Sequence, residues 1–140
     1  MPELTVTSRV LDAINTLVIE LHGDNRYSVS KVNAGKLVER VAREGRSGVV
    51  IDYRDCVLGH QMAEYNDIAR IFAEGMPRDL QFAYVFADAQ VAHIILMTRA
   101  LKAAGIRASG FPDLESACQW IEAGQAEASD IGTDTARPTA

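Results

Sequence analysis

The side chains best suited to chemistry gather where one predicted strand ends. The apolar segment 49–53 predicts a buried strand, and Asp52, Arg54 and Asp55 lie at its end, with His60 soon after. Ligands of open α/β sheets bind beyond the carboxyl ends of parallel strands, and the free N–H groups of a helix start attract anions. This arrangement favours a small-molecule or phosphate site. The alternative is an Asp–Arg pair that organises the loop and the start of the next helix.

A second pair of candidates belongs to the apolar helix predicted over 88–104. Asp88 stands at its start and His93 lies among Val, Ala and Ile residues. Together with the 52–60 segment, the start of this helix would form one ligand pocket. The alternatives are structural, because Asp is a good N-cap and a lone His on an apolar helix is often a hydrogen-bonded interior or interface residue.

Motifs for metals, nucleotides and nucleophilic catalysis are not found in the sequence. Cys56, His60 and Glu64 are spaced by four, which would suit zinc, but no second close pair supplies a fourth ligand. The patterns G-x-G-x-x-G, P-loop and G-x-S-x-G do not occur. We therefore predict no metal, no cofactor and no enzymatic activity.

The elements that must position these residues alternate along the chain. Apolar patterning predicts the order β-β-α-β-α-β-α-β-α, which implies a single, mostly parallel sheet with an antiparallel first strand and about four flanking helices, an α/β fold. Ser28 or Ser30 is expected to cap the first helix, Gly45 to end it, and Pro112 to lie in the first turn of the last one. The predicted strands are 4–10, 17–21, 49–53, 82–86 and 106–109, and the predicted helices are 28–44, 61–74, 88–104 and one that starts near 112.

Composition places further bounds on the molecule. The 140 residues are 48% hydrophobic with a net charge of −5, which excludes a fully disordered chain and a generic basic nucleic-acid binder. No apolar run approaches the ~20 residues of a membrane span. Two cysteines without a close-paired motif, and no signal segment, suggest a cytoplasmic protein with reduced thiols. The change to small and polar residues at Gly124 predicts a folded domain over 1–123 and a flexible tail over 124–140.

Local charge differs from the overall balance. Lys36, Arg40 and Arg43 fall close together at helical spacing on the predicted helix 28–44. This face could meet an acidic partner or an anionic membrane surface, and the alternative is a solvated helix face.

The element order, together with three late segments, resembles SpoIIAA-like, or STAS-like, proteins. The segments are the run from Phe82 to Asp88, the Gly105-Ile-Arg turn, and the helix from Phe111 that carries an Ala and then Trp120. The resemblance covers roughly residues 1–123 and implies an anti-sigma-antagonist type of regulatory module. Other relatives look like small cousins of CRAL-TRIO lipid-binding domains, although no apolar cavity can be recognised in the sequence.

Classical members of that family are switched by phosphorylation of a Ser or Thr at the start of the helix after the third strand. The corresponding stretch here, Asp52 to Gln61, contains neither. We therefore expect a non-enzymatic regulatory or protein-interaction module without this phospho-acceptor, which binds a protein partner or itself. The alternative is a small-molecule or lipid-binding domain with a site near 52–60.

Overall fold

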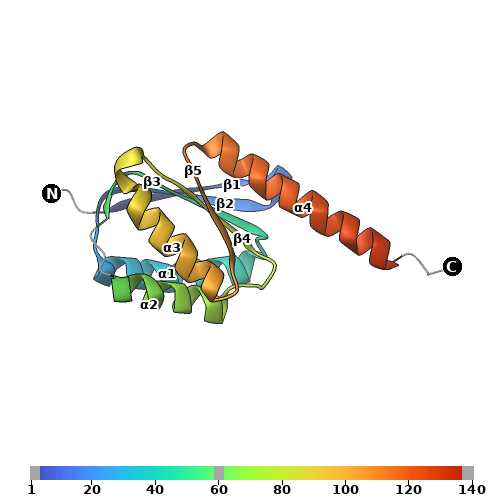
Figure 1. The fold of residues 1–140 in the computed structure, drawn as a ribbon, viewed down its shortest axis with the longest axis horizontal. Coiled ribbons are helices and arrows are strands. Elements are labelled where there is room, and N and C mark those ends of the chain that lie inside the picture. Colours follow the sequence, from blue (N-terminus) through green and yellow to red (C-terminus); the bar gives the residue numbers. More distant parts are fainter. Residues whose placement is uncertain (1–3, 59–61, 137–140) are drawn as a thin grey trace.

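Five strands form one mixed sheet in the order β1-β2-β3-β4-β5, flanked by four helices, in the computed structural model, which describes residues 4–58 and 62–136 (Figure 1). This confirms the predicted α/β fold. The strands are β1 (Thr5–Leu11), β2 (Thr16–Asn25), β3 (Gly48–Leu58), β4 (Gln81–Val85) and β5 (Arg107–Phe111). The helices are α1 (Tyr27–Glu44), α2 (Met62–Gly75), α3 (Val91–Ala103) and α4 (Leu114–Ala136), with short 3-10 turns η1 (Asp12–Ile14) and η2 (Asp88–Gln90).

Connection length sets the direction of each strand pair. Only η1 and Asn15 separate β1 from β2, so these strands pair antiparallel, with Ser8 opposite Ile19. Asn15 adopts a left-handed conformation with φ 46°, and its N–H donates to the Asp12 carbonyl at 3.2 Å. Every later connection contains a helix, and the strands it joins are parallel.

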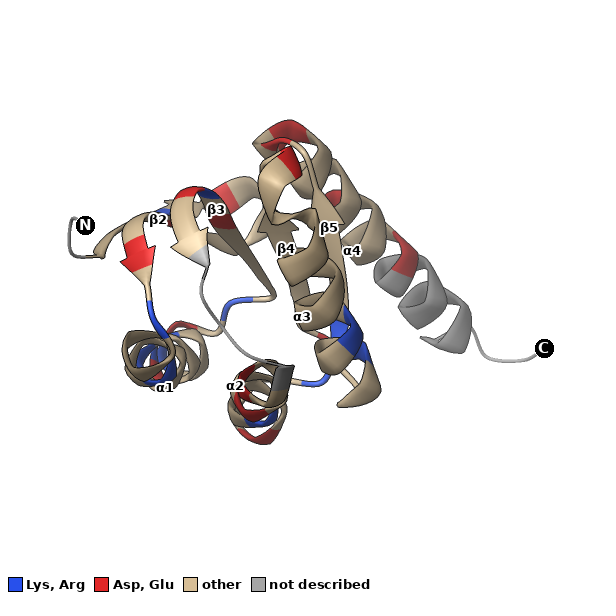
Figure 2. Ribbon diagram, turned by 60° about the vertical axis from the view of Figure 1, so that its left-hand side comes forward, with Lys and Arg blue, Asp and Glu red and all other residues tan. Residues whose placement is uncertain are grey.

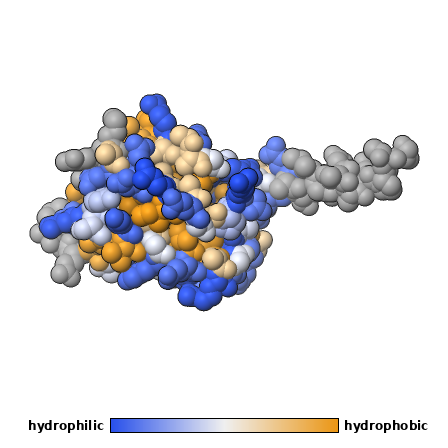
Figure 3. All heavy atoms as spheres, turned by 90° about the horizontal axis from the view of Figure 1, so that it is seen from below, coloured by the Kyte–Doolittle hydropathy of each residue, from blue (hydrophilic) through white to orange (hydrophobic). Residues whose placement is uncertain are grey.

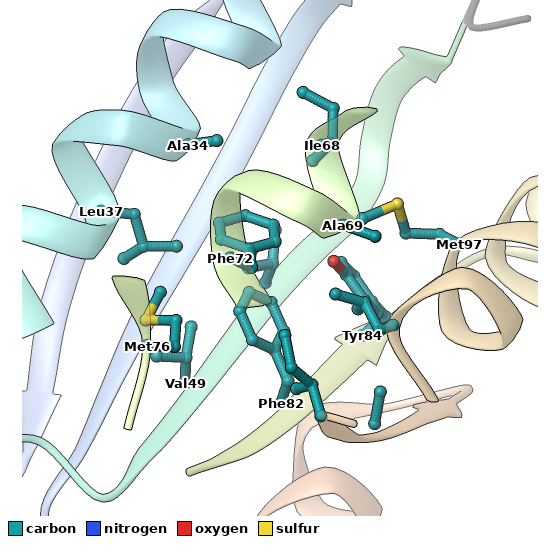
Figure 4. Packing of buried hydrophobic residues seen from close by; sticks show 14 of the residues in the cluster. Ala34, Leu37, Val49, Ile68, Ala69, Phe72, Met76, Phe82, Tyr84 and Met97 are labelled. Carbon is teal, nitrogen blue, oxygen red and sulfur yellow. The ribbon is translucent and has the colours of Figure 1, made fainter. Parts of the chain in front are cut away.

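Alternation along the strands divides the core into two layers. Val49 and Ile51 of β3 face α1, α2 and α3, whereas Val50 faces α4. The three-helix side holds the larger core, in which Phe72 of α2 packs on Phe82 of β4 with ring centroids 4.8 Å apart (Figure 4). On the other face α4 packs against the sheet, through residues such as Ile121.

The helix starts differ from those predicted. Arg26 occupies the N-cap position of α1 without a side-chain cap, and Ser30 instead donates to the Asn25 side chain at 2.7 Å, so the predicted serine cap is wrong. Asp88 does not cap its helix either: Ala87 holds the N-cap position of η2 and Asp88 is the first residue of that turn. α4 begins after Asp113, whose carboxylate accepts the Ser116 N–H at 2.7 Å. The expected end of α1 at Gly45 is confirmed by its left-handed φ of 68°.

β3 is longer than the predicted segment 49–53 and runs to Leu58. It continues to pair with β2 across a register shift between Glu20 and His22. Asp52, Arg54 and Asp55 therefore lie on a strand rather than in a loop, because the neighbouring β2 is long enough to supply hydrogen-bond partners.

α4 also extends past the predicted boundary at Gly124, since it continues to Ala136. Gly124 is buried, and the Gln125 side chain donates to the Ile14 carbonyl at 2.6 Å and to Ser47 Oγ at 3.1 Å. The helix therefore contacts the sheet beyond residue 123, whereas flexibility of residues 124–140 stays a prediction. Within the described ranges no helix is long and apolar enough to cross a membrane.

Candidate functional site

A cavity of about 310 Å³ lies between the sheet and the three helices on its larger core side. It runs from the edge strand β1, beneath α1, to α2 and α3. Its walls are mostly aliphatic and aromatic. They comprise Val6, Ser8, Ile19, Leu21, Asn25, Ser30, Asn33, Ala34, Lys36, Leu37, Arg40, Ile51, Tyr53, Tyr65, Ile68, Phe72, His93, Ile94 and Met97.

The position of α1 explains the cavity. Figure 2 shows α1 and α2 side by side beneath the sheet, with α1 under the β2 end. The buried face of α1 includes Ala34 and Leu37, which point inward from the helix in Figure 4, and the short Ala34 side chain lines the cavity. Leu21 and Ile19 of β2 also border the cavity.

Two polar side chains meet at the inner part of the cavity. Tyr65 of α2 and His93 of α3 share a hydrogen bond between the phenol oxygen and Nδ1. Burial, and then the charge of Glu64, raise the pKa of Tyr65, so this phenol stays protonated near neutral pH. His93 is thus a hydrogen-bonded, part-buried histidine, as expected if its role is structural. It also lines the cavity.

A stacked tyrosine pair adjoins this region. The rings of Tyr53 and Tyr84 are 5.3 Å apart and nearly parallel. Burial raises the pKa of both phenols. The Tyr84 hydroxyl is fully buried and makes no well-formed hydrogen bond with a described residue, its polar neighbour being the Tyr53 hydroxyl. Neutral phenols keep this wall apolar in character.

The mouth of the cavity lies between β1 and α1. Val6 is 45% exposed there, and Ser8 and Lys36 are also exposed. Arg40 reaches across from α1, and its Nη1 donates to Ser8 Oγ at 2.7 Å. The cavity is therefore apolar inside and bordered by two cations where it meets solvent. Figure 3 shows apolar atoms exposed among charged side chains on the underside of the molecule, the side on which α1 and α2 lie.

The predicted Asp–Arg pair forms on the opposite face of the sheet. Arg54 donates to both carboxylate oxygens of Asp52, with Nη2 at 2.7 Å from Oδ2, and its backbone N–H also donates to Asp52. Burial of Asp52 opposes ionisation, but the hydrogen bonds and charge of Arg54 outweigh it and lower the pKa of Asp52. Asp55 lies 3.4 Å from His22 Nδ1. These residues organise the sheet surface and do not line the cavity.

Of the five predicted site residues that the structure describes, His93 alone lines the cavity. Asp88 is exposed in η2, and Asp52, Arg54 and Asp55 lie on β3, as described above. His60 lies outside the described residues. The described part of the chain brings no three His, Cys, Asp or Glu side chains together as a metal site.

Gln90 is a structural link that the sequence did not reveal. Its buried amide donates to the Tyr53 and Cys56 carbonyls, the latter at 2.6 Å, and its oxygen accepts the Ala87 N–H at 3.0 Å. Gln90 therefore ties the end of β3 to the start of α3, beside the cavity. Burial raises the pKa of the neighbouring Cys56 thiol to about 12, which makes it a poor nucleophile.

Two solved structures share this arrangement. An anti-sigma factor antagonist from Mycobacterium paratuberculosis superposes with a TM-score of 0.64 at 16% identity, covering 86% of this chain and 95% of its own. An uncharacterised DUF3478-family protein from Shewanella loihica PV-4, described as having a SpoIIAA-like fold, gives a TM-score of 0.53 at 13% identity, covering 84% of this chain and 93% of its own.

This chain has a SpoIIAA-like fold. The expected resemblance is thereby confirmed at the level of the fold, including the antiparallel first strand pair. No protein-family model matches the sequence, and no curated protein matches it. At 16% and 13% identity, the two structures show a shared fold.

Proposed function

We propose that this SpoIIAA-like chain is a non-enzymatic binding module whose cavity beneath α1 takes a small apolar molecule. The cavity carries this proposal. Its volume of about 310 Å³ lies at the lower end of the ~300–1,000 Å³ range of small-molecule sites, and its walls are mainly apolar with a few polar groups. This cavity is not the site predicted near 52–60. That prediction named a similar ligand, a small molecule or lipid, but it was based on polar residues such as Asp52 and Arg54, which lie on the opposite face of the sheet.

The lining also supports a binding role rather than catalysis. Among the described residues, no carboxylate and no cysteine lines the cavity. A general base or nucleophile would need such a neighbour to be oriented and activated.

The binding proposal is tested by filling the cavity. Ala34 is 3% exposed and lines the cavity, whereas Ala42 is exposed on the same helix. Thermal unfolding is measured with and without 1-decanol for the parent chain, Ala34→Phe and Ala42→Phe. A ligand at about 100 times its Kd stabilises a protein by about 2.7 kcal/mol, so the parent and Ala42→Phe should gain several degrees in Tm.

Ala34→Phe should lose that gain, because the phenyl ring occupies the ligand's space. If decanol stabilises none of the three proteins, or stabilises Ala34→Phe as much as Ala42→Phe, the cavity is not the binding site.

A second proposal follows from the fold neighbours. One of them is described as an anti-sigma factor antagonist, and we infer that this chain also acts through protein contacts or self-association. Because Asp52 to Gln61 contains no Ser or Thr, this module would work without phosphorylation at that helix start. Light scattering on the purified chain tests self-association directly: a concentration-dependent dimer supports it, and a monomer at all concentrations contradicts that form of the proposal.

A further inference from the structure

The mouth of the cavity carries charge of one sign. Lys36 and Arg40 are four residues apart on α1, so their side chains project from the same face of the helix. Both border the cavity, together with the neutral Val6 and Ser8 of β1. No acidic side chain lines the cavity within the described ranges. An apolar ligand alone would gain nothing from this pair of cations.

The contacts of the two cations leave them able to bind an anion. Arg40 uses Nε for Glu44 at 2.8 Å and Nη1 for Ser8 at 2.7 Å, and its Nη2 is not engaged in these two hydrogen bonds with described residues. A guanidinium has five N–H donors, so it can bind a carboxylate while it keeps Glu44. Lys36 is exposed and forms no ion pair with another described residue. The Ser8 hydroxyl accepts from Arg40, and its own O–H can still donate.

The inner part of the cavity needs no polar ligand group. Ile94, Met97 and Phe72 form its apolar walls, and Tyr65 and His93 are hydrogen-bonded to each other. A ligand that matches both ends would therefore be polar and anionic at the β1 side and apolar toward α3. At about 30 Å³ per water-sized group, the cavity holds roughly ten non-hydrogen atoms.

We propose that the ligand is a medium-chain fatty acid, whose carboxylate is bound by Arg40 and Lys36 at the mouth while its alkyl chain lies beneath α1. This inference rests on the proposed binding function and specifies its ligand class. Charge-assisted hydrogen bonds fix the head group, and burial of methylene groups supplies most of the affinity.

The test compares decanoate with 1-decanol, which have the same chain length and differ in charge. Affinities are measured by isothermal titration calorimetry below the ligands' micelle or solubility limits. The parent chain is compared with Arg40→Met and Lys36→Met, which remove one charge each and keep much of the side-chain length. Arg43→Met is the control, because Arg43 is exposed on the same helix and does not line the cavity.

We expect the parent chain to bind decanoate at least tenfold more tightly than decanol. Arg40→Met and Lys36→Met should each weaken decanoate binding by about tenfold and leave decanol binding unchanged, whereas Arg43→Met should change neither by more than about twofold. If Arg40→Met does not fold, Lys36→Met still tests the proposal. Lys36 is exposed and forms no ion pair with another described residue, so its substitution should not disturb the fold.

Failure of this inference differs from failure of the proposed function. If decanol binds as tightly as decanoate, or if Lys36→Met weakens both ligands equally, the carboxylate site is wrong and the apolar cavity still binds. If neither ligand binds the parent chain, both proposals are overturned.

Discussion

At the residue scale, Arg54 and Asp52 form an ion pair on β3, with Nη2 of Arg54 2.7 Å from Oδ2 of Asp52. The spacing of Asp52 and Arg54 predicted a pair, and the pair forms, because residues two apart on a strand project from the same face. That same geometry turns them away from the cavity. The contacts of Gln90 were not predictable, because an amide that links two carbonyls and an N–H from different segments has no local sequence signature.

The Asp52–Arg54 pair gives a pH-dependent prediction. Burial raises the pKa of Asp52, but the hydrogen bonds and charge of Arg54 lower it by a larger amount, so the net shift is downward. The ion pair therefore stabilises the folded state fully only above the pKa of the unfolded chain, near 3.8. This stabilisation is lost as the pH falls through the lower pKa that Asp52 has in the folded protein. Arg54→Met should therefore cost about 1 kcal/mol near pH 7, a modest figure because Arg54 is partly exposed, and the difference should shrink as the pH falls below 3.8.

Urea unfolding of Arg54→Met, the parent chain and Arg99→Met at several pH values measures this effect. Arg99 is exposed on α3 and has no ion pair with a described residue, so its substitution should have little effect at any pH. A deficit of Arg54→Met that does not shrink at any pH below 3.8 would mean that its origin is not the ionised Asp52.

At the element scale, periodicity located every strand and helix, and tertiary contacts decided where they end. β3 runs past its apolar segment because β2 pairs with it as far as Leu58. α4 runs past Gly124 although small and polar residues follow, because Gly124 packs on Gln81 and Gln125 reaches Ile14 and Ser47. A domain boundary at 123 was inferred from composition, and these contacts depend on partners more than forty residues away.

Two helical glycines provide a matched test of that packing. A Cβ at Gly124 would lie 2.0 Å from Gln81 Nε2, whereas a Cβ at Gly35 of α1 would meet nothing within 4 Å. Ala favours helix over Gly, so Gly35→Ala should stabilise the chain by about 0.5–1 kcal/mol. Gly124→Ala should instead destabilise it by about 1–3 kcal/mol, because buried Gln81 must move and loses its bond to the Trp120 carbonyl.

Denaturant titration of the two variants measures both changes. If both substitutions raise the free energy of unfolding equally, Gly124 of α4 does not pack against Gln81 in solution.

At the scale of the whole molecule, the fold was predictable and the cavity was not. Alternating strands and helices predict a sheet with helices packed on its faces. A cavity, however, depends on the distance between one helix and the strands that it covers. Here α1 packs beside α2, and the small Ala34 faces β2 across the space. The lining comes from six elements, and its apolar residues look like ordinary core positions in the sequence. Of the polar candidates that the structure describes, only His93 lines the cavity.

The central claim is that ligand binds beneath α1 with its charged end at the β1 side. Titration of decanoate into ¹⁵N-labelled protein, followed by amide chemical shifts, tests it most directly. The account predicts shift changes that saturate and centre on Ser8, Leu21, Arg40 and Tyr65, with Ala117 and Ile121 beneath α4 unaffected. Changes confined to Asp52, Arg54 and Asp55, or no changes at all, would contradict it.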